Sequence, residues 1–528
     1  MSTRIARSAG IIGIATMASR LLGVAREMVL AALFGAGTSM DAFNVAFRIP
    51  NLLRDLFAEG AMTAAFIPTF TRTLAQGGRE KAWRLGNLVL NALLVVTGIV
   101  VVAGVLFAGP ITHLIASGDE FAAVPGKIEL TTLLTRLMLP FLTTIAVAVA
   151  MMGMLNSLHR FFIPALSPAM FNLATIACAF TLVPLMPRLG LPPIAGIAIG
   201  TLFGGLGQIA LQWPPLRKEG YRYRPILDFK DPALREVLRL MGPGTLGLAA
   251  VQFNVFVNTY LATTQPEGAV SWLGYAFRLM YLPIGLFGAS IATAAVPDIS
   301  RHAADGDVPA IRRTVSSALR LMLMLNVPAT VGLIVLADPI VAFLLQRHAF
   351  TGHDTRSTAA ALMCYAPGLI GYSVVKIASP TFYALRDSRT PAIVAVLAVA
   401  ANLAMNLALV RVLGFRGLAI GTALAALFNA GALLWLLARR LDGIEGRRIA
   451  TATLKILLAS ILMGIAAWST SHWLTRTMPE ASFAVKGFRL AAAIAAGVAV
   501  LAASARLLRI AEFDDAVARV LDRVKPAR

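Results

Sequence analysis

The sequence contains little charge and little cysteine for its length. Asp, Glu, Lys and Arg together make up only 14% of its 528 residues, whereas a typical soluble domain carries roughly 25%. The two cysteines, Cys178 and Cys364, both lie inside apolar stretches. A secreted disulfide scaffold and a cysteine-rich zinc fold are therefore excluded.

Apolar residues are abundant instead, at 58% of the chain with a mean hydropathy of +0.76. Repeated apolar stretches of about 20 residues are typical of membrane-spanning helices. We predict an all-α polytopic membrane protein with about fourteen transmembrane helices. The expected spans are approximately residues 10–34, 42–70, 88–109, 131–154, 165–187, 192–213, 240–263, 271–297, 320–344, 358–382, 391–410, 417–438, 452–474 and 488–508.

Lys and Arg are distributed unevenly between alternate loops. One set of loops, together with both termini, carries 31 of the 47 basic residues, and the other set carries nine. Because cytoplasmic loops are enriched in Lys and Arg, both termini are expected in the cytoplasm. The net charge of +21 then reflects orientation and contact with anionic membrane lipids, and no nucleic-acid partner is expected.

The chain also contains an internal repeat with offsets between 221 and 230 residues. Ala46-Phe47-Arg48 recurs as Ala276-Phe277-Arg278, Leu158 with Pro164-Ala165 recurs as Leu385 with Pro391-Ala392, and Gly196–Thr201 recurs as Gly417–Thr422. Three matches in order predict two six-helix lobes, related by a pseudo-two-fold axis along the membrane normal, with a central cleft. The expected lobes are residues 1–220 and 221–445, and residues 446–528 hold helices thirteen and fourteen and a cytoplasmic tail.

Several charged residues fall inside the expected spans. The basic ones are Arg20, Arg26, Arg48, Arg54, Arg136, Arg278 and Lys376, and the acids near them are Glu27, Asp41, Asp55 and Glu59. Each charge costs roughly 2.5–3.5 kcal/mol at the centre of an inserted helix, so these side chains must face water, a partner or a ligand. Guanidinium groups bind phosphate and carboxylate oxygens bidentately. The surplus of positive charge therefore predicts an anionic substrate, most simply a phosphate or pyrophosphate.

Other interpretations of these charges stay open. A neighbouring acid could neutralise each arginine, most directly Arg26 and Arg54, and Arg48 or Arg136 could extend to the membrane edge. Lys376 is expected to line the cavity, without an assigned role. The six histidines are scattered, and no nucleotide-binding or nucleophile motif is present. A transporter without a cofactor is therefore favoured over an enzyme.

The opening sixty residues carry a family resemblance. The segments Ser19–Glu27, Phe34–Gly37, Asp41–Phe43 and Arg48–Ala61 resemble the MurJ (MviN) family of bacterial lipid II flippases, within the multidrug/oligosaccharidyl-lipid/polysaccharide exporter superfamily. The resemblance implies alternating-access transport of lipid II, the undecaprenyl-pyrophosphate-linked disaccharide-pentapeptide of peptidoglycan synthesis, from the cytoplasmic to the periplasmic leaflet. It also implies that the last two helices form a groove for the lipid tail.

The same resemblance assigns site residues. Arg20, Arg26, Asp41, Arg54 and Arg278 match the charged cavity positions of the family and are expected to bind the head group. Glu27, Arg48, Asp55, Glu59 and Lys376 are further candidate cavity residues. Some members of the family use a sodium site, but the counterparts here, Asn258, Asn402 and Asn406, lack negative charge.

The sequence leaves alternatives open for the energy source and for the function. Membrane potential could drive export without an ion site, and a monovalent cation gradient is the other candidate. The alternative functions are export of another lipid-linked glycan and a non-transporting scaffold that assembles wall-synthesis enzymes. Wall-synthesis enzymes are therefore candidate partners.

Overall fold

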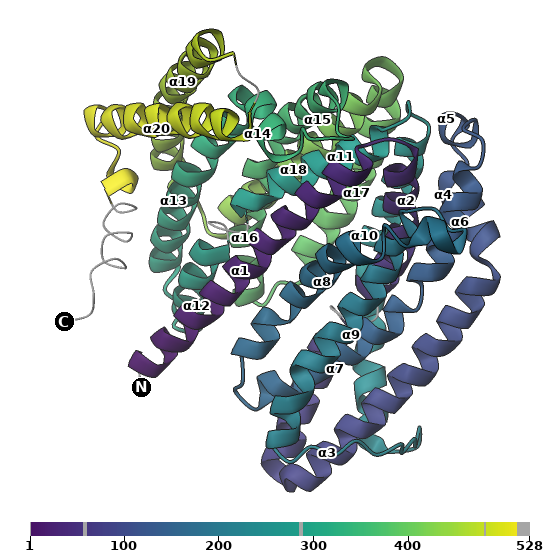
Figure 1. Ribbon diagram of the computed structural model, residues 1–528. Coiled ribbons are helices and arrows are strands. Elements are labelled where there is room, and N and C mark those ends of the chain that lie inside the picture. Colours follow the sequence, from purple (N-terminus) through teal and green to yellow (C-terminus); the bar gives the residue numbers. More distant parts are fainter. Residues whose placement is uncertain (1, 56–60, 285–288, 480–481, 515–528) are drawn as a thin grey trace. The chain divides into compact units, whose positions relative to one another are not determined.

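The computed structural model describes residues 2–55, 61–284, 289–479 and 482–514. Within these ranges, all regular secondary structure is helical, as Figure 1 shows. Helices satisfy their backbone hydrogen bonds internally, which a chain surrounded by lipid requires. The predicted all-α fold is confirmed.

Packing divides the chain into two compact units. The first comprises Met1–Ser271 with Arg347–Phe350, and the second comprises Trp272–Gln346 with Thr351–Arg528. The first unit contains α1 (Ser2–Phe34), α2 (Thr38–Arg54), α3 (Ala61–Leu106), α4 (Ala108–Ala116), α5 (Asp119–Ala122), α6 (Lys127–Met138), α7 (Phe141–Ser157), α8 (Phe162–Thr181), the 3-10 helix η2 (Met186–Leu189), α9 (Ala195–Lys218) and α10 (Pro232–Thr263).

The remaining helices belong to the second unit, apart from the first turn of α11, which lies in the first. They are α11 (Ala269–Pro283), α12 (Ala289–Ala304), α13 (Val308–Val335), α14 (Ala337–Leu344), α15 (Gly352–Tyr365), α16 (Gly368–Ala384), α17 (Arg389–Leu413), α18 (Phe415–Arg440), α19 (Gly446–Thr477) and α20 (Phe483–Leu507). The units change at residue 271 rather than 220, because α10 packs against α3 and α4 of the first unit. The repeat-based boundaries at 220 and 445 stay a prediction about internal homology.

Each unit has its own apolar core. In the first, α3, α7 and α9 pack together around buried aromatic residues that include Phe66, Phe70 and Phe141. In the second, α12, α13, α16 and α18 enclose Met322, Ile377 and neighbouring apolar side chains. The last two helices, α19 and α20, pack against each other, and α19 also packs against α13.

Fewer helices meet the length and hydropathy expected of a membrane span than the fourteen that the sequence predicts. In the described part of the chain, nine helical stretches are long and apolar enough to cross a membrane, one of them formed by α6 and α7 together. The number is ten if α15 and α16, bent by 41°, form one span. Helix α2 has only 17 residues, and Asp41, Arg48 and Arg54 interrupt its apolar pattern. The count of fourteen therefore stays a prediction.

Three of the expected spans consist of two helices each, namely 131–154 (α6 and α7), 320–344 (α13 and α14) and 358–382 (α15 and α16). The expected spans 42–70 and 271–297 each include residues that lie outside the described ranges. Pro140 and Pro367 lie at two of these breaks, where proline cannot donate a helical hydrogen bond. Conversely, the expected loop at 71–87 is helical and kinks at Gly78, whose φ of 74° favours glycine.

The glycine repeat has the same packing role in both units. A Cβ added at Gly196 of α9 would lie 2.8 Å from the backbone nitrogen of Val183, just after α8. A Cβ added at Gly417 of α18 would lie 2.3 Å from the carbonyl oxygen of Leu409 on α17. Small residues allow such close backbone approach between helices. The repeated glycines therefore mark equivalent helix-hairpin contacts.

We expect Gly417→Ala to destabilise the second unit by about 1–3 kcal/mol, because its methyl group would overlap a carbonyl oxygen. Gly431, on the same helix, has no atom within 4 Å of an added Cβ and provides the control. Gly431→Ala should leave stability unchanged or raise it by up to about 1 kcal/mol. Thermal unfolding in detergent micelles measures both effects, and equal losses for the two variants would contradict this interpretation.

Candidate functional site

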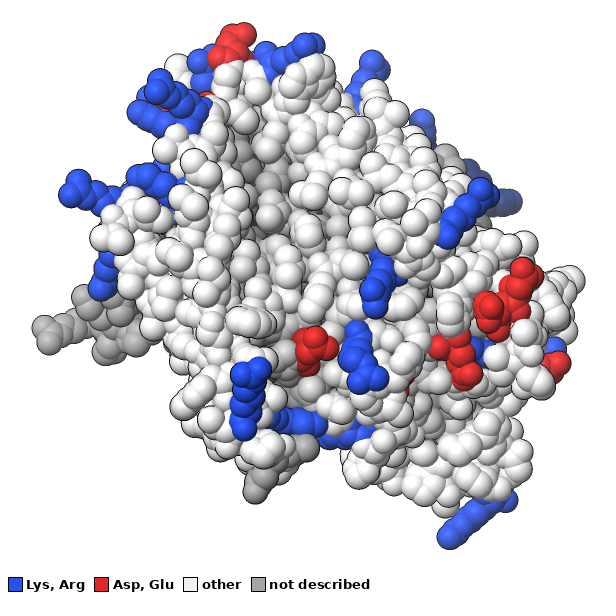
Figure 2. Space-filling view, turned by 90° about the horizontal axis from the view of Figure 1, so that it is seen from above, with Lys and Arg blue, Asp and Glu red and all other residues white. Residues whose placement is uncertain are grey.

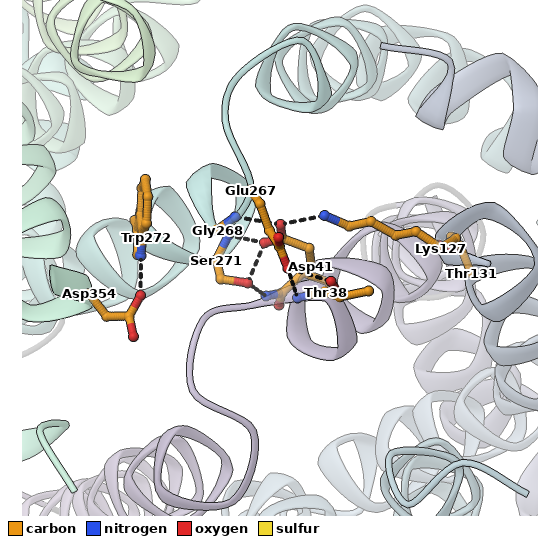
Figure 3. A network of polar contacts seen from close by, with 10 residues as sticks. Thr38, Asp41, Lys127, Thr131, Glu267, Gly268, Ser271, Trp272 and Asp354 are labelled. Carbon is orange, nitrogen blue, oxygen red and sulfur yellow. Dashed lines mark hydrogen bonds and ion pairs between the residues drawn. The ribbon is translucent and has the colours of Figure 1, made fainter. Parts of the chain in front are cut away.

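The most deeply buried charged group of the candidate site is the Asp41 carboxylate in the first unit (Figure 3). Asp41 and Lys127 are each only 1% exposed, and Lys127 Nζ lies 3.0 Å from Asp41 Oδ2. The backbone N–H of Gly268 donates to the same oxygen at 2.8 Å. The backbone N–H and the hydroxyl of Ser271 donate to Oδ1 at 3.0 and 2.7 Å. Each carboxylate oxygen thus accepts two hydrogen bonds.

The sequence positions explain why these groups meet. Asp41 lies in the first turn of α2, Lys127 begins α6, and Gly268 and Ser271 flank the start of α11. The first N–H groups of a helix lack partners within it and attract negative charge. Asp41 of α2 satisfies this need for α11. In return, Glu267 Oε1 accepts from the backbone N–H of Thr38 at 2.7 Å, and also from its hydroxyl, at the start of α2.

Asp41 is therefore engaged with protein groups in this conformation, and its assignment to substrate binding stays a prediction. Sequence reasoning missed Lys127 and Glu267 as its supporting residues. The sequence signal for Lys127 is a lone lysine directly before an apolar span, and this pattern does not differ from an ordinary loop charge. Lys127 also lies with Nζ 4.3 Å from the centre of the Phe121 ring, which adds a cation–π contact.

Arg26 lies on α1 within the first unit and forms an ion pair with its neighbour Glu27. Its guanidinium carbon lies 5.3 Å from the centre of the Phe171 ring on α8. Arg26 Nε is buried, and no hydrogen-bond partner for it is found among the described residues. Arg20 lies two turns earlier on the same helix and is half-buried. Glu27 is therefore the acid that neutralises Arg26, but the Nε–H donor of the Arg26 guanidinium does not bind it.

Arg54 shows the same pairing at the other end of α2. Its Nε and Nη2 atoms donate to Asp55 Oδ1 at 3.2 and 2.8 Å. Asp55 Oδ2 accepts from the amide of Gln252 on α10 at 3.1 Å, and Gln252 is buried. Sequence reasoning did not single out Gln252, because a lone glutamine in an apolar span carries no charge signal. Arg48 is exposed on α2, and Glu59 lies outside the described residues.

The second unit contributes two cations from different helices. Arg278 lies on α11 and Lys376 on α16, and both are partly buried. Phe277 of α11, which precedes Arg278, lies in contact with Tyr365 on α15 and Tyr372 on α16. The structure assigns Arg278 and Lys376 to one unit and Arg20, Arg26, Asp41 and Arg54 to the other.

The candidate ion-site asparagines divide between the units. Asn402 and Asn406 lie one turn apart on α17, where Asn406 Nδ2 donates to Asn402 Oδ1 at 3.2 Å. Asn402 Nδ2 lies 3.4 Å from the hydroxyl of Thr422 on α18. Asn258 lies on α10 of the first unit. Among the described residues, no group of three or more His, Cys, Asp or Glu side chains is placed to hold a metal ion.

One face of the molecule shows how sparse charge is on its surface. In Figure 2, most of the visible atoms belong to uncharged residues, and Lys and Arg occur more often than Asp and Glu. This agrees with the composition, which includes 47 basic and 26 acidic residues. Positive charge therefore prevails on this face.

Comparison with known proteins gives consistent results across sequence and structure. The family profile described as "Lipid II flippase MurJ" matches residues 30–488. A "Probable lipid II flippase MurJ" of Vibrio cholerae serotype O1 is 35% identical over 438 residues, covering 82% of this chain and 83% of the relative. A "Lipid II flippase MurJ" of Burkholderia cenocepacia is 33% identical and covers 81% of this chain and 82% of the relative.

Solved structures give the same result. The structure titled "Lipid II flippase MurJ, inward closed conformation" is similar at a TM-score of 0.76 and 25% identity, over 94% of this chain and 99% of that one. An inward-facing multidrug-resistance MATE transporter of the MOP superfamily is similar at a TM-score of 0.68 and 18% identity, over 82% and 99% of the two chains, which shows a shared fold. The relatives are named as transporters, and the chain, a multi-pass membrane protein, belongs to the lipid II flippase MurJ family.

Proposed function

We propose that this protein moves lipid II from the cytoplasmic to the periplasmic leaflet of the bacterial inner membrane, with both termini in the cytoplasm. The carrying observation is a set of cationic side chains within helices of a chain that belongs to a flippase family. Helix-centre charges cost roughly 2.5–3.5 kcal/mol each unless they face water or a ligand. A hydrated path for an anionic lipid head group would stabilise these cations, because it supplies both water and an anionic ligand.

The sign of the charge supports an anionic head group. The described cations of the candidate site are Arg20, Arg26, Arg48, Arg54, Arg278 and Lys376. Its described acids are Glu27 and Asp55, and a third acid, Asp41, is paired with Lys127. Positive charge therefore exceeds negative charge among the described site residues. The buried Nε of Arg26 offers a further donor. Guanidinium forks bind pyrophosphate oxygens with directed, charge-assisted hydrogen bonds.

The division of the chain into two compact units supports alternating access. Each compact unit has its own core, so each can move as a body while its internal packing is kept. Solved relatives of the same fold are titled as inward-facing and outward-facing MATE transporters. In the proposed cycle, the head group binds the cations from the cytoplasm, the lipid tail stays in the bilayer, and the units rearrange to release the head group outward.

Membrane potential supplies the driving force in this proposal. With the cytoplasm negative, outward movement of an anion is downhill by about 2.3 kcal/mol per charge per 100 mV. The candidate ion-site residues Asn258, Asn402 and Asn406 carry no charge, so sodium would gain little electrostatic stabilisation there. No cofactor takes part in this cycle.

The experiment reconstitutes the full chain in vesicles with lipid II and measures net movement between the leaflets. Imposing a potential should drive net transport in the direction that lowers the energy of the anionic head group, and collapsing the potential should stop it. A sodium gradient should not replace the potential. Protein-free vesicles provide the baseline. Transport driven by sodium alone would contradict the potential-driven cycle and favour an ion site at the asparagines.

The same vesicles separate the alternative functions. Transport of a different lipid-linked glycan, with none of lipid II, would replace the proposed substrate. If the protein moved neither lipid under either gradient, a scaffold that assembles wall-synthesis enzymes would become the better interpretation. Co-purification of those enzymes with the intact chain would then be the direct measurement.

A further inference from the structure

An aromatic cluster in the second unit surrounds Phe277 of α11. Its ring centre lies 5.7 Å from Tyr281 on the same helix, 5.5 Å from Tyr365 on α15 and 6.4 Å from Tyr372 on α16. Tyr281 and Tyr372 also meet, with ring centres 6.1 Å apart. We refer to Phe277, Tyr281, Tyr365 and Tyr372 as the tyrosine cluster. Three helices thus bring three amphipathic rings around one phenylalanine.

The first unit has a corresponding cluster with different chemistry. Phe47, which precedes Arg48 as Phe277 precedes Arg278, lies 6.0–6.1 Å from Phe43, Phe141 and Phe171. Both clusters fill the space around the repeated phenylalanine, but the partners are all phenylalanine in the first unit and all tyrosine in the second. Packing alone needs no hydroxyl groups at these positions. The tyrosines therefore indicate contact with something polar.

Two cations lie about one helical turn along the chain from tyrosines of the cluster. Arg278 and Tyr281 are three residues apart on α11, and Tyr372 and Lys376 are four apart on α16, so each pair shares a helix face. Lys376 forms no ion pair with a described residue. A face that carries a cation at this depth is costly toward lipid. Tyr281 is 39% exposed, so a ligand can reach its ring.

We propose that Tyr281 and Tyr372, together with Lys376, form a subsite for a sugar ring of the transported head group. This deepens the proposed function, on which it rests. A pyranose ring has an apolar face of C–H groups, which fits an aromatic face, and a rim of hydroxyls, which fits tyrosine hydroxyls and an ammonium group. Arg278, one turn away, is placed for the phosphate to which the sugar is attached. The subsite gives Lys376 a role.

The test compares two probes on the purified full chain in detergent. One is undecaprenyl pyrophosphate carrying the disaccharide-pentapeptide, and the other is undecaprenyl pyrophosphate alone. Tyr281→Leu and Tyr372→Leu should each weaken binding of the sugar-bearing probe about threefold to tenfold, since one aromatic contact contributes about 0.5–1.5 kcal/mol. Lys376→Met should also weaken binding of the sugar-bearing probe. Binding of the sugar-free probe should not change in any of the three variants.

Tyr383→Leu is the matched control, because Tyr383 lies on α16 with Tyr372 but is 56% exposed and belongs to no aromatic pair found in the described part of the chain. It should bind both probes as the wild type does. Unchanged affinity of the tyrosine variants, or an equal loss for both probes, would overturn the subsite while leaving the proposed function intact. If the wild type bound neither probe, the proposed function and the subsite would both be overturned.

Discussion

Replacing Lys127 with methionine is expected to destabilise the first unit by about 3–5 kcal/mol. Removing one partner of a buried ion pair leaves the other charge without compensation in a poorly solvated environment. Lys127 and Asp41 are each only 1% exposed, with 3.0 Å between Nζ and Oδ2. The two backbone N–H groups and the Ser271 hydroxyl that remain around Asp41 offset part of this cost. Chemical or thermal unfolding of the purified chain in detergent measures the loss.

A double variant separates the ion pair from simple packing. Adding Asp41→Asn to Lys127→Met removes both charges, so it should recover much of the lost stability. Lys81→Met is the control, since Lys81 is exposed on α3, and its change should stay within about 0.5 kcal/mol. If Lys127→Met unfolded like the wild type, the contact between α2 and α6 would not depend on this pair.

Replacing Arg26 or Arg278 with alanine is expected to abolish growth in cells depleted of their own flippase, with normal amounts of the protein in the membrane. Each hydrogen bond to a charged group contributes about 1.5–3 kcal/mol, and a guanidinium fork makes more than one. Loss of one fork should therefore reduce head-group binding by a factor of ten or more. Arg20→Ala belongs to the same series. Arg301→Ala is the control, because Arg301 is 71% exposed, and it should support normal growth.

The Arg26–Glu27 pair allows a sharper version of this experiment. If Arg26 serves only to neutralise Glu27, removing both side chains should restore growth. If Arg26 binds the head group, the double variant Arg26→Ala with Glu27→Ala should remain inactive. Wild-type growth of the three single arginine variants would remove the head-group role from these residues.

Much of the architecture follows from local sequence. Apolar stretches and scarce charge determine that the chain is helical, because each helix satisfies its own backbone hydrogen bonds. The interruptions within three expected spans, at residues 139–140, 336 and 366–367, do not follow as directly. Pro140 and Pro367 are visible in the sequence, but proline also occurs inside continuous helices here, as at Pro168 and Pro328. Whether a proline ends a helix depends on what packs around the freed carbonyl.

The candidate site divides in the same way. The chain's residues alone show that arginines lie within apolar stretches, and the pairs Arg26–Glu27 and Arg54–Asp55 are adjacent in sequence, so their contacts could be foreseen. Gln252 could not, because it reaches Asp55 from a position 197 residues away. A neutral side chain gives no sequence signal of the charge that it supports.

Sequence by itself determined that this is a helical membrane protein of the flippase family with arginines inside apolar stretches, because hydropathy and charge are properties of residues and short segments. Tertiary structure decided which charges are already satisfied. Asp41 is paired with Lys127, 86 residues away, and accepts from Gly268, 227 residues away. The same holds for the three tyrosines that meet around Phe277 from three helices. A buried charge or ring is stabilised by whatever packs against it, and only the folded chain determines those neighbours.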